Sequence, residues 1–249
     1  MSALFAELAG RETPMGWLSL RRRLEPSRQV DVYEVKLGDE FLMSSLFTAA
    51  EIELARLGLA ELEGDELDVV VGGLGLGYTA RAVLEDDRVR SMVVVEALVD
   101  VIAWHEDELL PEVEGLAADP RCRLVQGDFF ALARGGTGFD PDDPGRRFDA
   151  ILVDIDHTPS RVLDPSHADL YTPDGLRRMV GSLHEGGVFG LWSDDPPDAD
   201  FLDVLREVFV DVRGEVVTFP NFYTGGESAN TVYLARRAVT SPRGRPGAR

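Results

Sequence analysis

The sequence predicts an α/β fold with a doubly wound, mostly parallel sheet, preceded by a small β-rich N-terminal region. Three observations lead to this prediction. From Leu67 onward the chain contains apolar runs without polar alternation, which is typical of strands buried on both faces. Segments with helical spacing separate these runs. A glycine-rich turn follows the first run, where open α/β sheets bind ligands.

Each predicted element follows from its local pattern. Residues 29–45 alternate polar and apolar side chains around Gly-Asp-Glu, which indicates a β-hairpin, and residues 48–62 have helical spacing. The predicted strands are LDVVVGG, RSMVVVEAL, CRLVQGDFF, FDAILVDID, GGVFGLWS, GEVVTFP and NTVYLARR, and the last two are able to form an antiparallel pair. Residues 134–147 are rich in Gly, Pro and Asp and predict a loop. We therefore predict an N-terminal region over 1–60, a nucleoside-binding domain over 61–237 and a disordered basic tail over 238–249.

The composition limits the classes of partner. The 249 residues carry 45 acidic and 25 basic side chains, a formal net charge of −20, so binding to nucleic acid is not expected. The same charge favours a small cationic amine as substrate, although solubility is the plainer cause of it. Cys122 is the only cysteine, which excludes an internal disulfide. The sequence has no membrane-spanning run or signal pattern, so we expect a cytoplasmic protein without membrane contact.

The glycine turn is the first candidate binding site. Gly73, Gly75 and Gly77 follow the first strand, and glycines there let the backbone approach a ligand closely. Glu96 ends the second strand, about 20 residues farther on, where an acidic residue accepts hydrogen bonds from ribose hydroxyls in nucleotide-binding folds. Taken alone, the glycines are equally consistent with a structural turn.

Acidic residues also end the next two strands. The third run ends at Asp128 and Phe129, where a carboxylate could bind an adenine amino group and an aromatic ring could cover the base. The fourth run ends at Asp154 and Asp156. Because the carboxyl ends of parallel strands meet at one edge of the sheet, these residues predict a nucleoside site there.

This ordered series resembles the AdoMet-dependent methyltransferase fold, which is Rossmann-like, and within it the spermidine synthase (polyamine aminopropyltransferase) family. VVVGGLGLGYTARAVLED resembles the family's glycine-rich motif, and FDAILVDIDHTP its motif of an apolar strand followed by acidic residues. HADLYTPDGLRRMVGSLHEGGVF and FYTGGESANTVYLARR are similar to its later segments. The resemblance implies aminopropyl transfer from decarboxylated AdoMet to a polyamine, and a homodimer.

The resemblance also implies roles for individual residues. Glu96 would bind the ribose, Asp128 the adenine, and Asp154 would accept a proton from the attacking amine. Tyr223 is expected to assist Asp154 in that step. The residues expected to bind the amine substrate are Glu51, Asp156, His157 and Tyr171.

Three positions depart from the family pattern. Leu76 replaces the acidic residue of the glycine motif, and His157 replaces the substrate-binding Asp. In the family's triplet of an aromatic residue, Gln or His, and Glu, Ala49 and Ala50 replace the first two residues and only Glu51 is kept. Methyl transfer from AdoMet is therefore an alternative function, and a non-catalytic nucleoside-binding protein is another. The four histidines lack paired metal-ligand spacing, so no metal is expected, and an NAD enzyme is a more distant alternative.

Overall fold

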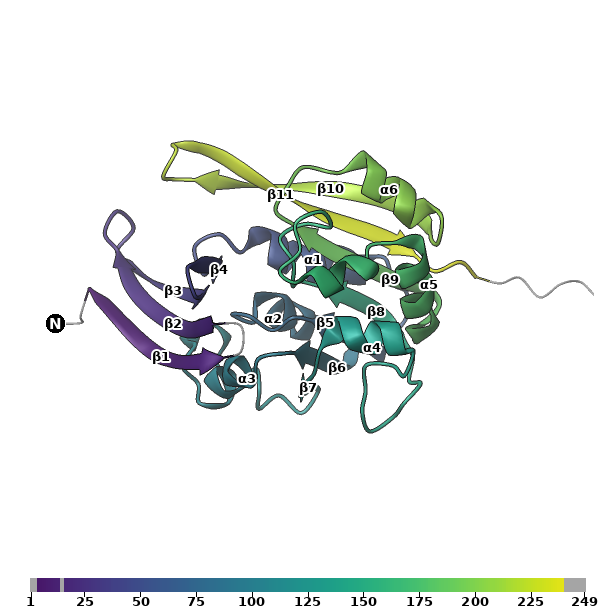
Figure 1. The fold of residues 1–249 in the computed structure, drawn as a ribbon, viewed down its shortest axis with the longest axis horizontal. Helices are drawn as coiled ribbons and strands as arrows, with labels where there is room; N and C mark the ends of the chain where they lie inside the picture. Colours follow the sequence, from purple (N-terminus) through teal and green to yellow (C-terminus); the bar gives the residue numbers. More distant parts are fainter. Residues whose placement is uncertain (1–3, 14–15, 240–249) are drawn as a thin grey trace, which may run out of the picture.

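The computed structural model of the chain describes residues 4–13 and 16–239, which form a seven-stranded sheet and a separate four-stranded sheet (Figure 1). The larger sheet has the order β10-β11-β9-β8-β5-β6-β7. Its strands are β5 (Leu67–Gly72), β6 (Val89–Glu96), β7 (Cys122–Gln126), β8 (Phe148–Val153), β9 (Leu183–Ser193), β10 (Val210–Asn221) and β11 (Gly226–Arg236). All seven predicted strands are present, and the predicted doubly wound α/β class is confirmed.

The strand order reverses beside β5. From β5 the chain moves outward through β6 to β7, then crosses back to β8 on the other side of β5. Strands β5 to β9 pair in parallel, whereas β11 is antiparallel to both β9 and β10, as expected for the last two runs. In open α/β sheets such a reversal leaves a crevice at the carboxyl ends of the strands, where ligands bind.

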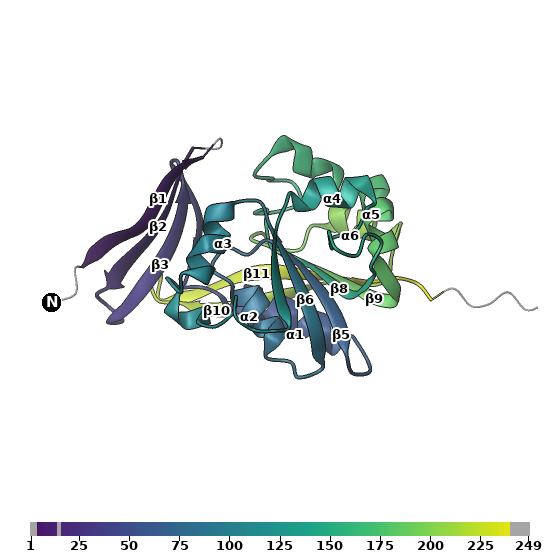
Figure 2. The same ribbon diagram turned by 90° about the horizontal axis from the view of Figure 1, so that it is seen from below.

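Helices cover both faces of this sheet (Figure 2). Side chains alternate along a strand, so Val69 and Val71 pack into one core, and Val70 packs into the other. The first core includes residues of α1 (Ala49–Ala60), α2 (Tyr78–Leu84) and α3 (Val99–Glu106). The second includes residues of α4 (Phe129–Gly135), α5 (Pro173–Met179) and α6 (Ala199–Arg206). Short 3-10 helices span η1 (Pro111–Val113), η2 (Pro165–Asp169) and η3 (Val180–Ser182).

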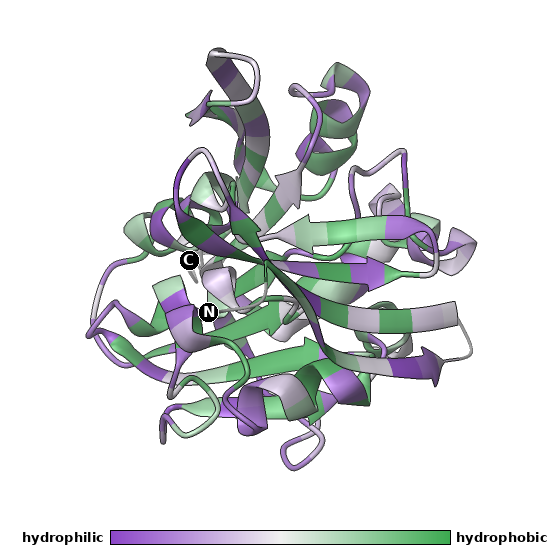
Figure 3. Cartoon of the chain, turned by 90° about the vertical axis from the view of Figure 1, so that its left-hand side faces the viewer, coloured by the Kyte–Doolittle hydropathy of each residue, from purple (hydrophilic) through white to green (hydrophobic). Residues whose placement is uncertain are grey.

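The N-terminal sheet is antiparallel throughout, with the order β1-β2-β3-β4. Its strands are β1 (Phe5–Thr13), β2 (Gly16–Glu25), β3 (Val30–Leu37) and β4 (Glu40–Ser44), so the predicted hairpin is present as β3 and β4. Strands β1 and β2 were not predicted, because β2 lacks the alternation of polar and apolar residues that marks a strand. Its residues Leu18, Ser19 and Leu20 are all buried, and three arginines follow them. Figure 3 shows hydrophilic and hydrophobic residues interspersed along the strands facing the viewer.

Helix α1 joins the two sheets. The Leu54 side chain of α1 packs against Gly190 of β9, and the Leu152 side chain of β8 packs against Gly58 of α1. Helix α1 therefore packs on the seven-stranded sheet. Leu18 and Leu20 of β2 belong to the same core as Leu54. The domain boundary predicted at residue 60 stays a prediction. Of the predicted disordered tail, residues 240–249 lie outside the described residues.

Within the part of the chain that the structure describes, no helix is both long and apolar enough to cross a bilayer.

Candidate functional site

The glycine turn connects β5 to α2 in a conformation that requires glycine. Gly73, Gly75 and Gly77 have φ values of 91°, 48° and 87°, in the left-handed region. A Cβ on Gly73 would lie 2.2 Å from the carbonyl oxygen of Asp154, and one on Gly77 would lie 2.6 Å from the His105 ring. The turn therefore packs directly against the end of β8, at the reversal of strand order.

Glu96 holds the turn from the neighbouring strand. Its Oε2 accepts a hydrogen bond from the Leu74 amide at 3.0 Å, and its Oε1 accepts one from the Leu98 amide at 2.8 Å. Burial raises the pKa of this carboxyl, and the backbone amides act in the opposite direction. Glu96 thus lies at the end of β6 where the ribose-binding residue was predicted, with both oxygens engaged by the backbone.

The two residues after β7 differ in their surroundings. Asp128 is exposed and caps α4, accepting a hydrogen bond from the Ala131 amide at 3.0 Å. Phe129 is only 2% exposed and stacks on Phe139, with ring centroids 4.6 Å apart. The Phe129 ring packs in the core because it begins a helix that packs on the sheet, and its predicted contact with a bound base stays a prediction.

Asp154 and Glu51 form the most unusual electrostatic feature of this edge. Asp154 follows β8, and its Oδ2 accepts a hydrogen bond of 2.7 Å from the Thr79 hydroxyl. That hydroxyl also lies 3.1 Å from the main-chain carbonyl of Glu51 in the first turn of α1. Glu51 is 6% exposed, and its Oε2 has no hydrogen-bond partner among the described residues. Three elements thus bring two buried carboxyl groups together beside the glycine turn.

Burial disfavours charge on both carboxyl groups. It raises the pKa of Asp154 to about 6, against the Thr79 hydrogen bond, which lowers it. It raises the pKa of Glu51 to about 8, and the negative charges of Asp154 and Asp194 add to that shift. Burial thus disfavours ionisation of both carboxyl groups, and only Asp154 has a hydrogen-bond donor that favours its charge. A carboxylate with a pKa close to the working pH is suited to accept a proton in catalysis.

Asp156 has a structural environment. It is 1% exposed, and its oxygens accept hydrogen bonds from the Leu163 amide, the His167 ring and the Tyr171 hydroxyl at 2.7 to 2.8 Å. Tyr171 is itself buried, and burial together with the neighbouring Asp156 raises its pKa. Asp156 and Tyr171 thus bind each other and hold the segment after β8, and their predicted contacts with the substrate stay a prediction.

The other two predicted acceptor-side residues also bind protein groups. His157 Nε2 lies 3.2 Å from Glu40 of the N-terminal sheet. The Tyr223 hydroxyl donates a hydrogen bond to Glu25 at 2.6 Å and accepts one from Arg23 at 3.1 Å. Tyr223, expected to assist Asp154, is therefore engaged by residues of β2.

The structure also places Leu76, which replaces the acidic residue of the family motif. Its side chain is 1% exposed and belongs to the hydrophobic core. Its amide donates a hydrogen bond of 2.9 Å to the thioether of Met43 on β4. A Cβ on Gly75 would lie 2.4 Å from the same sulfur, so the N-terminal hairpin rests directly on the glycine turn.

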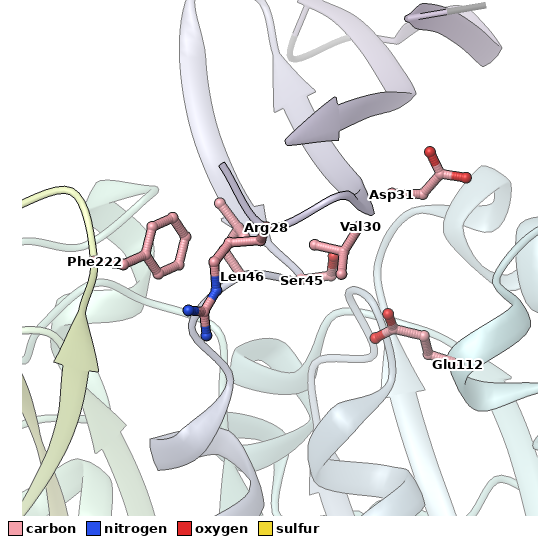
Figure 4. A pocket seen from close by; sticks show the side chains of 7 residues that line it. All are labelled: Arg28, Val30, Asp31, Ser45, Leu46, Glu112 and Phe222. Carbon is pink, nitrogen blue, oxygen red and sulfur yellow. The ribbon is translucent and has the colours of Figure 1, made fainter. Parts of the chain in front are cut away.

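A cavity of about 390 Å³ lies between the N-terminal sheet and the larger unit. Figure 4 shows Arg28 beside Phe222 on one side, and Asp31 and Glu112 on the other. The Arg28 guanidinium lies 5.1 Å from the centre of the Phe222 ring. Glu112 also accepts a hydrogen bond from Tyr78, the first residue of α2, so the cavity opens next to the glycine turn.

Three residues of this region are not among those predicted from sequence: Thr79, Met43 and His105. Thr79 lies in the first turn of the helix after the glycine turn, and a polar residue there is a signal that the sequence does contain. His105 Nε2–H donates to the Gly75 carbonyl at 2.9 Å, and burial lowers the pKa of the ring. Nothing in the spacing of Met43 or His105 indicates their contacts, which depend on tertiary packing.

Over the described residues, no cluster of three or more His, Cys, Asp or Glu side chains could hold a metal ion.

Comparison with curated proteins gives a consistent set of relatives, although no family model matches the chain. A "Polyamine aminopropyltransferase 2" of Pseudomonas aeruginosa is 31% identical over 162 residues, which are 62% of this chain and 43% of the relative. A "Polyamine aminopropyltransferase" of Pyrobaculum islandicum is 28% identical over 121 residues, 49% of this chain and 39% of the relative. Each alignment spans less than half of the relative's length.

Two solved structures have a similar fold. The spermidine synthase of Thermotoga maritima matches with a TM-score of 0.69 and 19% identity, covering 94% of this chain and 74% of that one. A spermidine synthase in complex with the transition-state analogue AdoDATO matches with a TM-score of 0.70 over the same shares. The chain is thus similar in sequence to polyamine aminopropyltransferases and has the fold of spermidine synthase, as its motifs predicted.

Proposed function

We propose that this chain is a transferase that binds decarboxylated AdoMet and transfers its aminopropyl group to an amine of a polyamine. The observation that carries the proposal is the buried Asp154–Glu51 pair beside the glycine turn, at the reversal of strand order. The similarity to polyamine aminopropyltransferases supports the same activity. The donor is here a substrate, and Glu96 and Asp128 are the proposed contacts for its ribose and adenine.

In the proposed reaction the protein positions the two substrates and accepts one proton. The neutral amine nitrogen attacks the carbon bound to the sulfonium, the carbon–sulfur bond breaks, and methylthioadenosine leaves with the electron pair. The amine of such a substrate is protonated at neutral pH and must lose a proton to react. Asp154, whose carboxyl has a pKa raised by burial, is the proposed acceptor of that proton, and alignment of the two reactants provides the rest of the acceleration.

Methyl transfer from AdoMet is the second candidate. In the described residues of the glycine turn, no acidic side chain is present to bind the aminopropyl ammonium of decarboxylated AdoMet, and the Leu76 side chain packs into the core. The Leu76 amide has only a thioether as acceptor, and a carboxylate is a much stronger one. Substituting Leu76→Asp would bury a carboxylate in the core, so the preference is better tested with ligands than with that variant.

The experiment combines binding and product analysis. Calorimetric titration with AdoMet and with decarboxylated AdoMet measures the preference, and mass spectrometry with a polyamine mixture identifies the by-product. Tighter binding of the decarboxylated donor with release of methylthioadenosine supports the proposal. Tighter binding of AdoMet with release of S-adenosylhomocysteine supports methyl transfer, and binding without any product supports a non-catalytic role.

A variant pair tests the role of Asp154. Asp154→Asn is expected to lower kcat by roughly 10²- to 10⁴-fold, the usual contribution of a general base. Asp174→Asn is the control, because its side chain is 79% exposed at the start of α5. Unchanged turnover in Asp154→Asn would remove Asp154 from the mechanism.

Three further expectations stay proposals. We propose that Glu51 and the cavity next to Tyr78 serve the acceptor side, supported by their acidic groups. A homodimer and a cytoplasmic location follow only from the family resemblance and the sequence pattern. Size-exclusion chromatography with light scattering measures the number of subunits directly.

A further inference from the structure

Thr79 lies where three elements meet at the candidate site. It is the second residue of α2, the helix that follows the glycine turn, and is 3% exposed. Its hydroxyl lies 2.7 Å from Asp154 Oδ2 and 3.1 Å from the main-chain carbonyl of Glu51. A hydroxyl has one hydrogen to donate, and a carboxylate accepts it more strongly than a carbonyl does. The hydrogen is therefore directed to Asp154.

The two carboxyl groups compete for a single negative charge. Both are buried, and the charge of Asp154 disfavours ionisation of Glu51. Glu51 Oε2 has no partner among the described residues, whereas Asp154 has the Thr79 hydroxyl. The other titratable groups facing the pair are Asp194, which disfavours charge on Glu51, and the Tyr78 phenol. None of these groups stabilises a charge on Glu51.

We propose that Thr79 is a positioning residue that keeps the negative charge on Asp154 rather than on Glu51. The single hydrogen bond to Oδ2 fixes the carboxylate and leaves Oδ1 as the oxygen that accepts the amine proton. Glu51 stays neutral and can hydrogen-bond the amine without holding it as an ammonium ion. This inference rests on the proposed function, because it assigns the proton acceptor of that reaction.

The test removes the hydroxyl and preserves the shape. Thr79→Val is nearly isosteric, and Thr79→Ser restores the hydroxyl. Carboxyl bands in pH-difference infrared spectra, assigned with Asp154→Asn and Glu51→Gln, report each ionisation without substrate. We expect Thr79→Val to raise the proton affinity of Asp154 about tenfold or more, the size of a charge-assisted hydrogen bond, and Thr79→Ser to restore it. The acid limb of kcat/KM should shift with it to higher pH.

Wild-type spectra test the inference even when the valine variant does not fold. The band that ionises first should disappear in Asp154→Asn and remain in Glu51→Gln; the reverse assignment overturns the proposal. An unchanged Asp154 titration in a folded Thr79→Val protein also overturns it. Absence of the proposed activity under every assay condition would contradict the proposed function. The infrared spectra need no turnover, so they would still show which of the two carboxyl groups carries the charge.

Discussion

Glu51 shows how a site residue can weaken the fold that carries it. In the unfolded chain its carboxyl titrates near its ordinary pKa of 4.5, whereas burial and the charge of Asp154 raise the folded value to about 8. The folded protein then binds the proton more tightly than the unfolded chain. The resulting stabilisation is present at low pH and is lost as the pH rises from 4.5 through the folded pKa.

We therefore expect Glu51→Gln to stabilise the protein increasingly from pH 5 to pH 8. Each tenfold change in proton affinity corresponds to about 1.4 kcal/mol, so a gain of more than about 1 kcal/mol at pH 8 is expected. Urea denaturation at both pH values measures it. Glu53→Gln, on the half-buried side of the same helix, is the control. Equal effects of the two substitutions at pH 8 would contradict the assigned burial of Glu51.

Among elements, the glycine turn is the one most constrained by its surroundings. Gly73 and Gly64 have similar φ values, 91° and 87°. A Cβ added to Gly64 would meet no atom, whereas one added to Gly73 would clash with its neighbours. Gly64→Ala should cost about 1–2 kcal/mol from the left-handed conformation alone. Gly73→Ala adds a clash with the Asp154 carbonyl and should cost at least about 1 kcal/mol more. Thermal unfolding of both variants compares them, and equal costs would show that β8 moves freely away from the turn.

The N-terminal hairpin is a second element that acts on this turn. Met43 of β4 occupies the acceptor position of the Leu76 amide and the space beside Gly75. A ligand tail that uses that amide has to displace the thioether. Met43→Ala is therefore expected to raise donor affinity several-fold in calorimetry, whereas Met43→Leu, which keeps the volume, should not. Weaker binding in Met43→Ala would identify Met43 as a ligand contact.

The larger sheet could be predicted from sequence because its strands are continuous apolar runs bounded by glycines and acids. The edge residues Glu96 and Asp154 followed from the same pattern, since strand ends position them. Phe129 could not be assigned this way, because a residue beginning a helix can face either the site or the core. The pairing of Glu51 with Asp154 depends on how α1 packs, and no local pattern encodes it.

At the scale of the whole molecule, two sheets meet around the candidate site, and side chains far apart in sequence connect them. Tyr223 lies between β10 and β11, at the tip of the larger sheet, and its hydroxyl donates to Glu25 at the end of β2. Phe47 packs edge-on against the Tyr223 ring at 6.2 Å. This cluster ties the tip of the larger sheet to the N-terminal sheet.

Tyr223→Phe therefore tests whether this tyrosine holds the two sheets together or takes part in catalysis. The hydrogen bond from Tyr223 is the main cause that lowers the pKa of Glu25 to about 2. A depressed carboxyl pKa stabilises the fold above the unfolded value and loses that effect as the pH falls toward 2. Hydrogen exchange at the end of β2 should thus be faster in Tyr223→Phe at pH 7, with a difference that shrinks below about pH 4.

The same variant should lower kcat by less than tenfold, because the hydroxyl is bound to Glu25 and Arg23. Glu25→Gln is the companion variant. If the two side chains act together, the double variant exchanges no faster than either single one, since residues in one hydrogen-bonded cluster are not additive. A kcat loss of two orders of magnitude with unchanged exchange would instead place Tyr223 in the proton-transfer step, and would require the tip of the larger sheet to leave β2 during turnover.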